Sequence, residues 1–132
     1  MPWQRPKTDW KASDYFNIGD YNRIIGNVVC LREMAVEVYP LFNLEDMGDE
    51  KQYADYLYAD ELNTIERNLT ALCANTYPFP IGEEKTYFPN LPTPDWQEFN
   101  RIESACLMMY LNLSGQIIGR RRLSFVLGGI RI

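Results

Sequence analysis

One short pattern occurs three times in the chain and constrains its fold more than any other feature. An acidic residue is followed by a large apolar residue, an asparagine, one variable residue and an isoleucine, at 20–24 (DYNRI), 61–65 (ELNTI) and 98–102 (EFNRI). The three asparagines lie roughly forty residues apart, a period typical of a repeated supersecondary unit. The sequence therefore predicts three related structural units.

Each copy of the pattern opens a predicted helix. Apolar residues follow it at the alternating three- and four-residue spacing of a buried helix face. The helices are expected from the N-cap Asn17 to Pro40, over about 60–75, and from Asp95 to a stop at Ser114-Gly115. The matching positions are Tyr21, Leu62 and Phe99; Ile24, Ile65 and Ile102; Val28, Leu69 and Cys106; Leu31, Leu72 and Met109. We expect a mainly α fold, a compact three-helix bundle built from pseudo-repeats.

Two flanking segments complete the predicted organisation around a repeat domain at 17–115. Residues 1–16 lack helical periodicity and are expected to form an extended N-terminal arm, held down by Trp3, Trp10, Tyr15 and Phe16. Residues 116–132 form a basic and apolar tail. Its stretch Leu123–Leu127 alternates and branches like a strand and precedes two glycines, so a short C-terminal β-strand is expected there.

A second echo lies in the links between the helices. Residues 48–53 (GDEKQY) follow the first helix and residues 82–87 (GEEKTY) follow the second, while 7–10 (KTDW) is a third, looser version with one extra residue before its aromatic. The echo makes 48–53 and 82–87 parts of the same repeated unit, which runs from a helix through Tyr-Pro and a short crossing to Gly-acid-Glu-Lys-x-Tyr. Each segment is expected to form a small strand or an ordered loop.

Charge is distributed unevenly along the chain. The net charge is −5, yet the tail carries Arg120, Arg121, Arg122 and Arg131 and no acid. Such a tail can pair with its own acidic body or with a neighbouring copy. Nucleic acid is not expected as a partner, because the arginines lack an aromatic platform or a known motif. No membrane association is expected, since no apolar run approaches the ~18 residues of a span, and there is no apolar stretch typical of a secretion signal.

The repeated asparagines Asn22, Asn63 and Asn100 have two readings. Asparagine is a poor helix former, so its presence in all three units suggests a specific hydrogen bond. In the first reading each amide bridges to the preceding loop of its own domain. In the second the amides bond across an interface and fix its register. The tail has a similar pair of readings, as a strand on its own arm or a strand added to a neighbouring subunit.

Residues for chemistry are scarce. The chain has no histidine, which excludes Ser-His and Cys-His nucleophiles, and the spacing of Cys30, Cys73 and Cys106 fits no zinc site. We expect reduced, packed thiols, and no phosphate loop, metal or cofactor site. Glu66 and Glu103 occupy matching positions three residues after their asparagines. An enzyme reading requires these acids to converge in a pocket, and the prediction is that the protein is not an enzyme.

The helix-opening residues 61–66 (ELNTIE) and 98–103 (EFNRIE), with 7–10 and 20–24 before them, resemble segments near the start of bacteriophage tail-fibre, baseplate and other tail-tip proteins. The resemblance points to phages and prophages of Gram-positive bacteria and to phage-tail-like particles. It implies a structural module that attaches or trimerises tail components, with no catalytic residues, located in the virion tail after synthesis in the bacterial cytoplasm. Other tail or baseplate proteins and further copies of the chain are the implied partners.

The expected role is therefore that of a non-enzymatic assembly or adaptor subunit acting through protein–protein contacts. Its candidate interaction residues are Asn22, Asn63, Asn100, Trp3, Trp10, Arg120, Arg121, Arg122, Phe125 and Arg131. The alternative is a ligand- or carbohydrate-binding module that uses surface tyrosine and tryptophan. That alternative predicts aromatic side chains gathered in one exposed cleft, whereas the assembly reading places them under the arm and tail.

Overall fold

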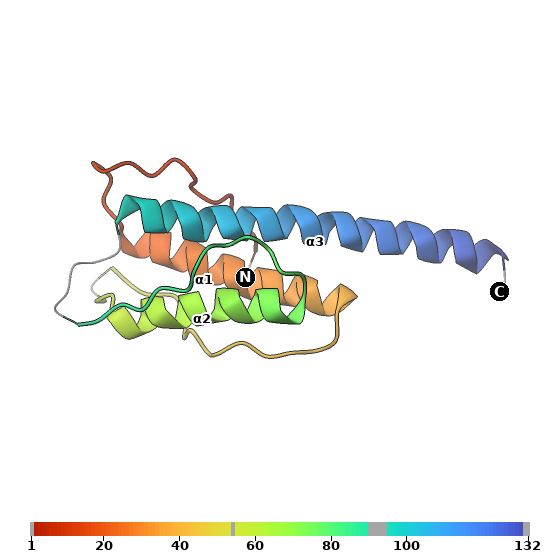
Figure 1. Cartoon of the computed structure of the whole chain (residues 1–132), viewed down its shortest axis with the longest axis horizontal. Coiled ribbons are helices and arrows are strands. Elements are labelled where there is room, and N and C mark those ends of the chain that lie inside the picture. The colour runs from red at the N-terminus through yellow and green to blue at the C-terminus, as the bar shows by residue number, and fades with distance from the viewer. Residues whose placement is uncertain (1, 54, 90–94, 131–132) are drawn as a thin grey trace.

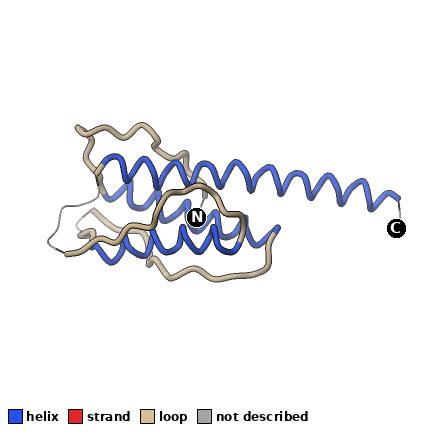
Figure 2. Tube along the Cα trace, viewed as in Figure 1, coloured by secondary structure: helices blue, strands red, loops and turns tan. Residues whose placement is uncertain are grey.

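Three helices form the fold. The computed structural model describes residues 2–53, 55–89 and 95–130, with side chains as far as residue 121. The helices are α1 (Ile18–Val38), α2 (Ala59–Asn75) and α3 (Trp96–Ile130). The prediction of a mainly α protein with three helices packed together is confirmed. The described residues contain no β-strand (Figure 2).

All three helices run in the same direction. Figure 1 shows them beginning at one end of the bundle, while the links after α1 and α2 return along the helices to that end. Antiparallel neighbours in a bundle need only about 2–8 connecting residues. The links 39–58 and 76–95 are much longer than that. They can span the whole length of a helix in extended form, which permits the parallel arrangement.

The predicted helix starts are confirmed by their caps. The Asn17 side chain accepts a hydrogen bond from the Asp20 backbone N–H, and the Asp20 carboxylate accepts one from the Asn17 N–H, each at 3.0 Å. At α3, the Asp95 carboxylate accepts from the Glu98 N–H at 3.1 Å. These bonds satisfy backbone donors that have no partner inside the helix. At its other end, α1 stops at Val38, ahead of Pro40 as expected.

The core consists of the predicted apolar faces. Helix α1 packs against both α2 and α3. The twelve residues that the sequence placed in matching positions are all buried, and Ile25, Val38, Phe42, Phe79 and Ile117 extend this core. Burying each large side chain contributes roughly 1.5–3 kcal/mol. Phe42 and Phe79 come from the links, so the extended segments are part of the core as well as connections.

The predicted end of the third helix is wrong. α3 continues through Ser114-Gly115 and reaches Ile130, so the expected strand at 123–127 is helix instead. A glycine inside a helix costs only about 1 kcal/mol relative to alanine. Burial of Ile117 on the core, beyond the glycine, opposes that cost. No proline follows to stop the helix, and a lone strand is unstable without a partner edge.

The N-terminal arm is extended and largely anchored, as predicted. Trp3 stacks on Tyr110 with ring centroids 4.0 Å apart, and Phe16 stacks on Phe99 at 4.1 Å. Trp10 is buried. Tyr15 departs from the prediction because its side chain is 91% exposed. The arm therefore belongs to the folded domain through three of its four expected anchors.

Candidate functional site

Each repeated asparagine holds one extended segment by both halves of its amide. Asn22 accepts a hydrogen bond from the Lys51 N–H at 2.8 Å and donates one to the Lys51 carbonyl at 2.9 Å. Asn63 makes the same pair of bonds with Tyr87, at 2.6 and 2.8 Å. Asn100 makes it with Trp10, at 2.8 and 3.0 Å. A side-chain amide thus replaces the backbone partner that a neighbouring strand would supply.

This result supports the within-domain reading of the asparagines, with one correction. The loop held is not the preceding one. Asn22 and Asn63 hold the link that follows their helix, and Asn100 holds the arm, 90 residues earlier in the chain. The three amides are therefore committed to their own chain.

Two further asparagines hold extended backbone in the same way, each five residues after a repeated asparagine. Asn27 exchanges two hydrogen bonds with the backbone of Gln4, and Asn68 exchanges two with that of Glu45, all at 2.8–3.0 Å. Neither residue was predicted from the sequence. Asn27 and Asn68 follow Asn22 and Asn63 by the same interval, so comparison of the repeats would have revealed them. Ala105 holds the corresponding place on α3 and is buried.

Together these bonds give the domain a cyclic organisation. The arm is held by α1 through Asn27 and by α3 through Asn100. The first link is held by α2 through Asn68 and by α1 through Asn22. The second link is held by α2 through Asn63. We call each place where two helices and one extended segment meet a junction: α1–α3 holds the arm, α1–α2 the first link and α2–α3 the second link.

Two junctions contain a buried ion pair. At α1–α3, the Glu103 carboxylate accepts from Arg23 at 2.7 and 2.9 Å, from the Lys7 N–H at 3.0 Å and from the Trp10 indole. Charge-assisted bidentate hydrogen bonds of this kind are stronger than hydrogen bonds between neutral groups. The carboxylate is only 1% exposed, yet four donors satisfy it.

The α2–α3 junction repeats that arrangement. Glu66 accepts from the Arg101 guanidinium, from the Tyr87 hydroxyl at 2.7 Å and from the Lys85 N–H. Lys7 and Lys85 are therefore equivalent, and so are Trp10 and Tyr87. In the first link it is the backbone of Lys51, not that of Tyr53, that is held as the Tyr87 backbone is, and Tyr53 is fully exposed.

The α1–α2 junction lacks the ion pair. Ile25 stands where the other two have glutamate, and Thr64 stands where they have arginine. Ile25 is buried in the core. Because both charged residues are replaced, no single charge is buried at this junction without a partner.

The acid that opens each repeat also has a partner. Asp20 pairs with Arg23 at 2.9 Å, and Glu98 pairs with Arg101 at 3.0 Å. The second unit has no arginine in its motif. There Glu61 pairs instead with Lys51 of the extended link, at 2.8 Å. Each position that the repeated pattern fixes thus contacts the chain's own core, arm or links. We call these hydrogen bonds and ion pairs at the junctions the internal framework.

The electrostatic environment of the framework keeps arginine charged and tyrosine neutral. Burial alone would lower the pKa of Arg23, but its bonds to Glu103 and Asp20 outweigh burial and raise that pKa. Burial, assisted by Glu61, raises the pKa of Tyr21 to about 12. Burial likewise raises the pKa of the Cys106 thiol to about 12, with Glu103 adding to the effect. Such a thiol is not a reactive nucleophile.

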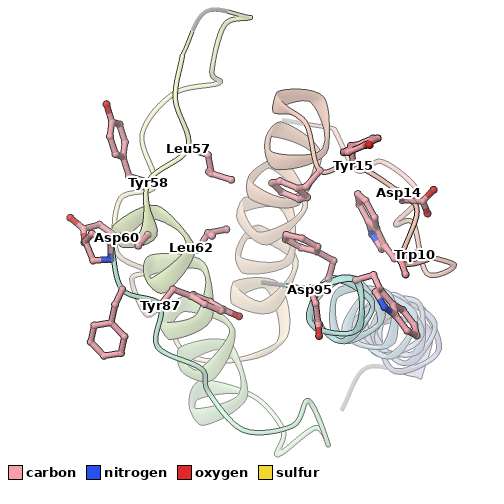
Figure 3. Close-up of a pocket in the computed structure, with 16 residues that line it drawn as sticks. Trp10, Asp14, Tyr15, Leu57, Tyr58, Asp60, Leu62, Tyr87 and Asp95 are labelled. Carbon is pink, nitrogen blue, oxygen red and sulfur yellow. The ribbon is translucent and has the colours of Figure 1, made fainter. Parts of the chain in front are cut away.

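An open pocket lies at the end of the bundle where the helices begin, with a volume of about 800 Å³. Figure 3 shows Leu57, Leu62 and Tyr87 on the side of α2, facing Trp10 and Asp14 of the arm. We call it the N-terminal pocket. Its inner wall is apolar and its rim carries exposed aromatic rings and carboxylates. The inner wall comprises Trp10, Phe16, Leu57, Leu62, Tyr87 and Phe99; the rim comprises Tyr15, Tyr58, Phe88, Trp96, Asp14, Asp60 and Asp95.

At the opposite end, α3 extends past the last turns of α1 and α2 (Figure 1). Ile118, Arg120 and Arg121 are exposed there. Arg121 lies 3.6 Å from Glu37 of α1, a surface pair of little energetic weight. We call the part of α3 from Gly119 to Ile130 the α3 extension.

The structure divides the predicted interaction residues into three groups. Asn22, Asn63, Asn100, Trp3 and Trp10 all contact the chain's own arm, links or helices. Arg120 and Arg121 are exposed on the α3 extension. Arg122 and Phe125 lie on the same helix, with side chains outside the described part, and Arg131 lies outside the described residues altogether. The α3 extension and the N-terminal pocket are therefore the candidate interaction surfaces.

In the described part of the chain, no group of three or more Cys, Asp or Glu side chains is arranged to hold a metal ion. None of the described helices is long and apolar enough to cross a membrane.

The comparisons with known proteins identify no relative. No family model matches the chain, and neither the curated proteins nor the solved structures contain a match.

Proposed function

We propose that the protein is a non-enzymatic structural subunit of a phage tail or baseplate, which joins other components through protein–protein contacts. The observation that carries this proposal is the α3 extension, a helix that continues beyond the bundle with exposed Arg120 and Arg121. A surface helix that leaves its own domain has no intramolecular partner to stabilise it, and isolated helices are marginal in water. A partner that packs against it supplies that stability.

The use of the acids inside the domain supports a structural role. Glu66 and Glu103 are the residues that a catalytic function would require, but each is saturated by an arginine and by donors from an extended segment. They also belong to different junctions. The buried carboxylates thus stabilise the arrangement of helices and links.

The test is whether the protein is present in assembled particles. Phage or phage-tail-like particles from an induced culture of the source strain are purified, and the chain is quantified by mass spectrometry. We expect it in fixed ratio to other tail proteins. A variant with Arg120, Arg121 and Arg122 changed to glutamate should be lost from the particles. The control carries the same charge change at exposed Arg5, Lys11 and Lys85. Absence of the unmodified chain from all particles contradicts the proposal.

A second candidate function is glycan binding at the N-terminal pocket. The observation in its favour is that Tyr15, Tyr58, Phe88 and Trp96 are exposed around one cleft, as that alternative predicted. Sugar rings stack on aromatic faces, and carboxylates accept hydrogen bonds from their hydroxyls. Titration with cell-wall oligosaccharides, followed by tryptophan fluorescence, tests this function, with Phe88→Ala as the variant expected to lose binding because it keeps Trp96 as the reporter.

A further inference from the structure

We propose that the N-terminal pocket of one copy binds the arginine-rich α3 extension of a second copy, so that copies associate head to tail. This inference rests on the proposed assembly function and names the partner and the two surfaces. It joins two exposed regions of the described chain that take no part in holding the arm and links.

The chemistry of the pocket favours a basic and apolar occupant. Its rim carries the carboxylates of Asp14, Asp60 and Asp95, and none of the described residues that line it is a lysine or arginine. Lys7 pairs with Asp14 at 3.3 Å, and Lys51, which lies 5.6 Å from the centre of the Tyr58 ring, pairs with Glu61. Asp60 and Asp95 form no ion pair with another described residue, so the rim keeps an acidic excess. The aromatic rings at the rim can also receive guanidinium groups through cation–π contacts.

The inner wall argues against a sugar and for an apolar peptide segment. Leu57, Leu62 and Phe99 offer no hydrogen-bonding group. Sugar hydroxyls placed against them would lose their bonds to water without replacement. Aliphatic and aromatic side chains would instead gain from leaving water there.

The chain itself contains a segment of the matching composition. Between Gly119 and Ile130 it combines three consecutive arginines with Leu123, Phe125, Val126, Leu127 and Ile130, and it contains no acid. The acidic pocket and this segment are therefore complementary in charge, and both have apolar surface to bury.

The segment cannot reach the pocket of its own chain. Trp96 borders the pocket at the start of α3, and Arg121 lies near the far end of the same continuous helix. At 1.5 Å per residue, the two are roughly 38 Å apart along a rigid helix. Pairing between the two surfaces must therefore join different copies. A contact between two unlike surfaces extends into a filament or closes into a ring.

The experiment uses two full-length variants, each with one surface disabled. The pocket variant carries Asp60→Lys and Phe88→Lys, both at exposed rim positions. The extension variant carries Arg120→Glu, Arg121→Glu and Arg122→Glu. The matched controls are Asp49→Lys with Tyr53→Lys, and Arg5→Glu with Lys11→Glu and Lys85→Glu, all exposed and outside the pocket. Circular dichroism and thermal unfolding verify that each variant is folded.

Light scattering and analytical ultracentrifugation then give the mass of each protein and of their mixtures. We expect the unmodified chain and both controls to form species larger than a monomer, with association at least tenfold weaker in 0.5 M salt. Each variant alone should be monomeric. The equimolar mixture should form a complex with one copy of each variant and no more, because one intact pocket and one intact extension remain.

Three outcomes overturn the inference. Association of the pocket variant at unmodified strength would show that the extensions bind one another. A mixture that stays monomeric would show that the two surfaces are not partners. Monomeric unmodified chain that binds an oligosaccharide at the pocket would assign the pocket to a glycan. None of these outcomes decides the assembly function, which the presence of the chain in purified particles tests separately.

Discussion

The α1–α3 and α1–α2 junctions each hold an extended segment between two helices, but one contains a buried ion pair and the other an apolar side chain in its place. Both have an asparagine that holds an extended segment by two backbone bonds. The first adds a buried ion pair between Arg23 and Glu103, whereas the second replaces both partners with Thr64 and Ile25. The asparagine is thus the constant element, and the ion pair is a feature that this fold can exchange as a unit.

At each junction the arginine and the glutamate are therefore either both present or both absent. A buried ion pair contributes little net stability, because desolvation offsets the attraction between its charges. Removal of one partner alone leaves a charge in the interior without compensation. A junction with only one partner should be less stable than one with both or neither, which agrees with the joint presence or absence of the two residues at all three junctions.

The largest expected effect comes from breaking one ion pair halfway. Glu103→Ile copies Ile25 but leaves the Trp10 indole and the Lys7 N–H without their acceptor, and Arg23 keeps only its pair with Asp20. We expect a loss of about 3–5 kcal/mol in the free energy of unfolding, measured by urea denaturation. Glu33→Ile, at an exposed position of α1, is the control and should change stability little.

The companion variant combines Glu103→Ile with Arg23→Thr and so copies both exchanged helix positions of the α1–α2 junction. It should be more stable than Glu103→Ile alone, with a coupling energy on the order of 1–3 kcal/mol in a double-mutant cycle. Additive losses would mean that the two side chains act independently, contrary to the comparison.

The next effect concerns the element that the junctions share. Asn100→Ala removes both hydrogen bonds to the Trp10 backbone and leaves a partly buried N–H and C=O without partners. We expect a loss of about 1–3 kcal/mol and faster amide exchange in the arm, measured by hydrogen–deuterium exchange. Asn112→Ala, at an exposed position of α3, provides the control. If the arm amides of the variant exchange as slowly as those of the parent protein, Asn100 does not hold the arm in place.

A pH series distinguishes the junctions by their titratable groups. Tyr21 occupies the seam position that Phe99 fills in the third unit, and its pKa is raised from 10.0 to about 12. Because the unfolded chain loses the tyrosine proton first, this contribution to stability is complete below pH 10 and declines between pH 10 and 12. Its size is on the order of 2 kcal/mol. Tyr21→Phe should make the alkaline loss of stability shallower in denaturation curves recorded at successive pH values.

The smallest effect is expected from building the missing pair. Ile25→Glu combined with Thr64→Arg gives the α1–α2 junction the residues of the other two. The net change should lie within roughly 1 kcal/mol of zero, since attraction and desolvation nearly cancel. Ile25→Glu alone should be far more damaging. A large stabilisation of the double variant would show that the attraction within the ion pair clearly exceeds the cost of burying its charges.

Much of the local structure was predictable from the sequence. The caps at Asn17 and Asp95 and the stop before Pro40 depend on residues a few positions apart, and each was confirmed. The continuation of α3 past Gly115 was not predictable in the same way. It was decided by the packing of Ile117 on the core, which a local reading of a glycine does not include.

The candidate surfaces were predictable only in part. The composition of residues 119–130 marked the α3 extension as a basic and apolar segment before its structure was known. The N-terminal pocket was not predictable, because its walls come from the arm, both links and the starts of α2 and α3. Side chains so far apart in sequence give no pattern that a periodicity can detect.

The sequence by itself determined the number of helices, the buried face of each and the asparagine that every repeat retains, because these follow from short-range spacing and propensity. Only the tertiary structure decided that the helices run in parallel, which segment each asparagine holds, and that Glu103 meets Arg23 across 80 residues of chain. The physical reason is that a hydrogen bond or an ion pair needs a partner in space. Such a partner is supplied by the way the links return along the bundle, and residue spacing does not encode that path.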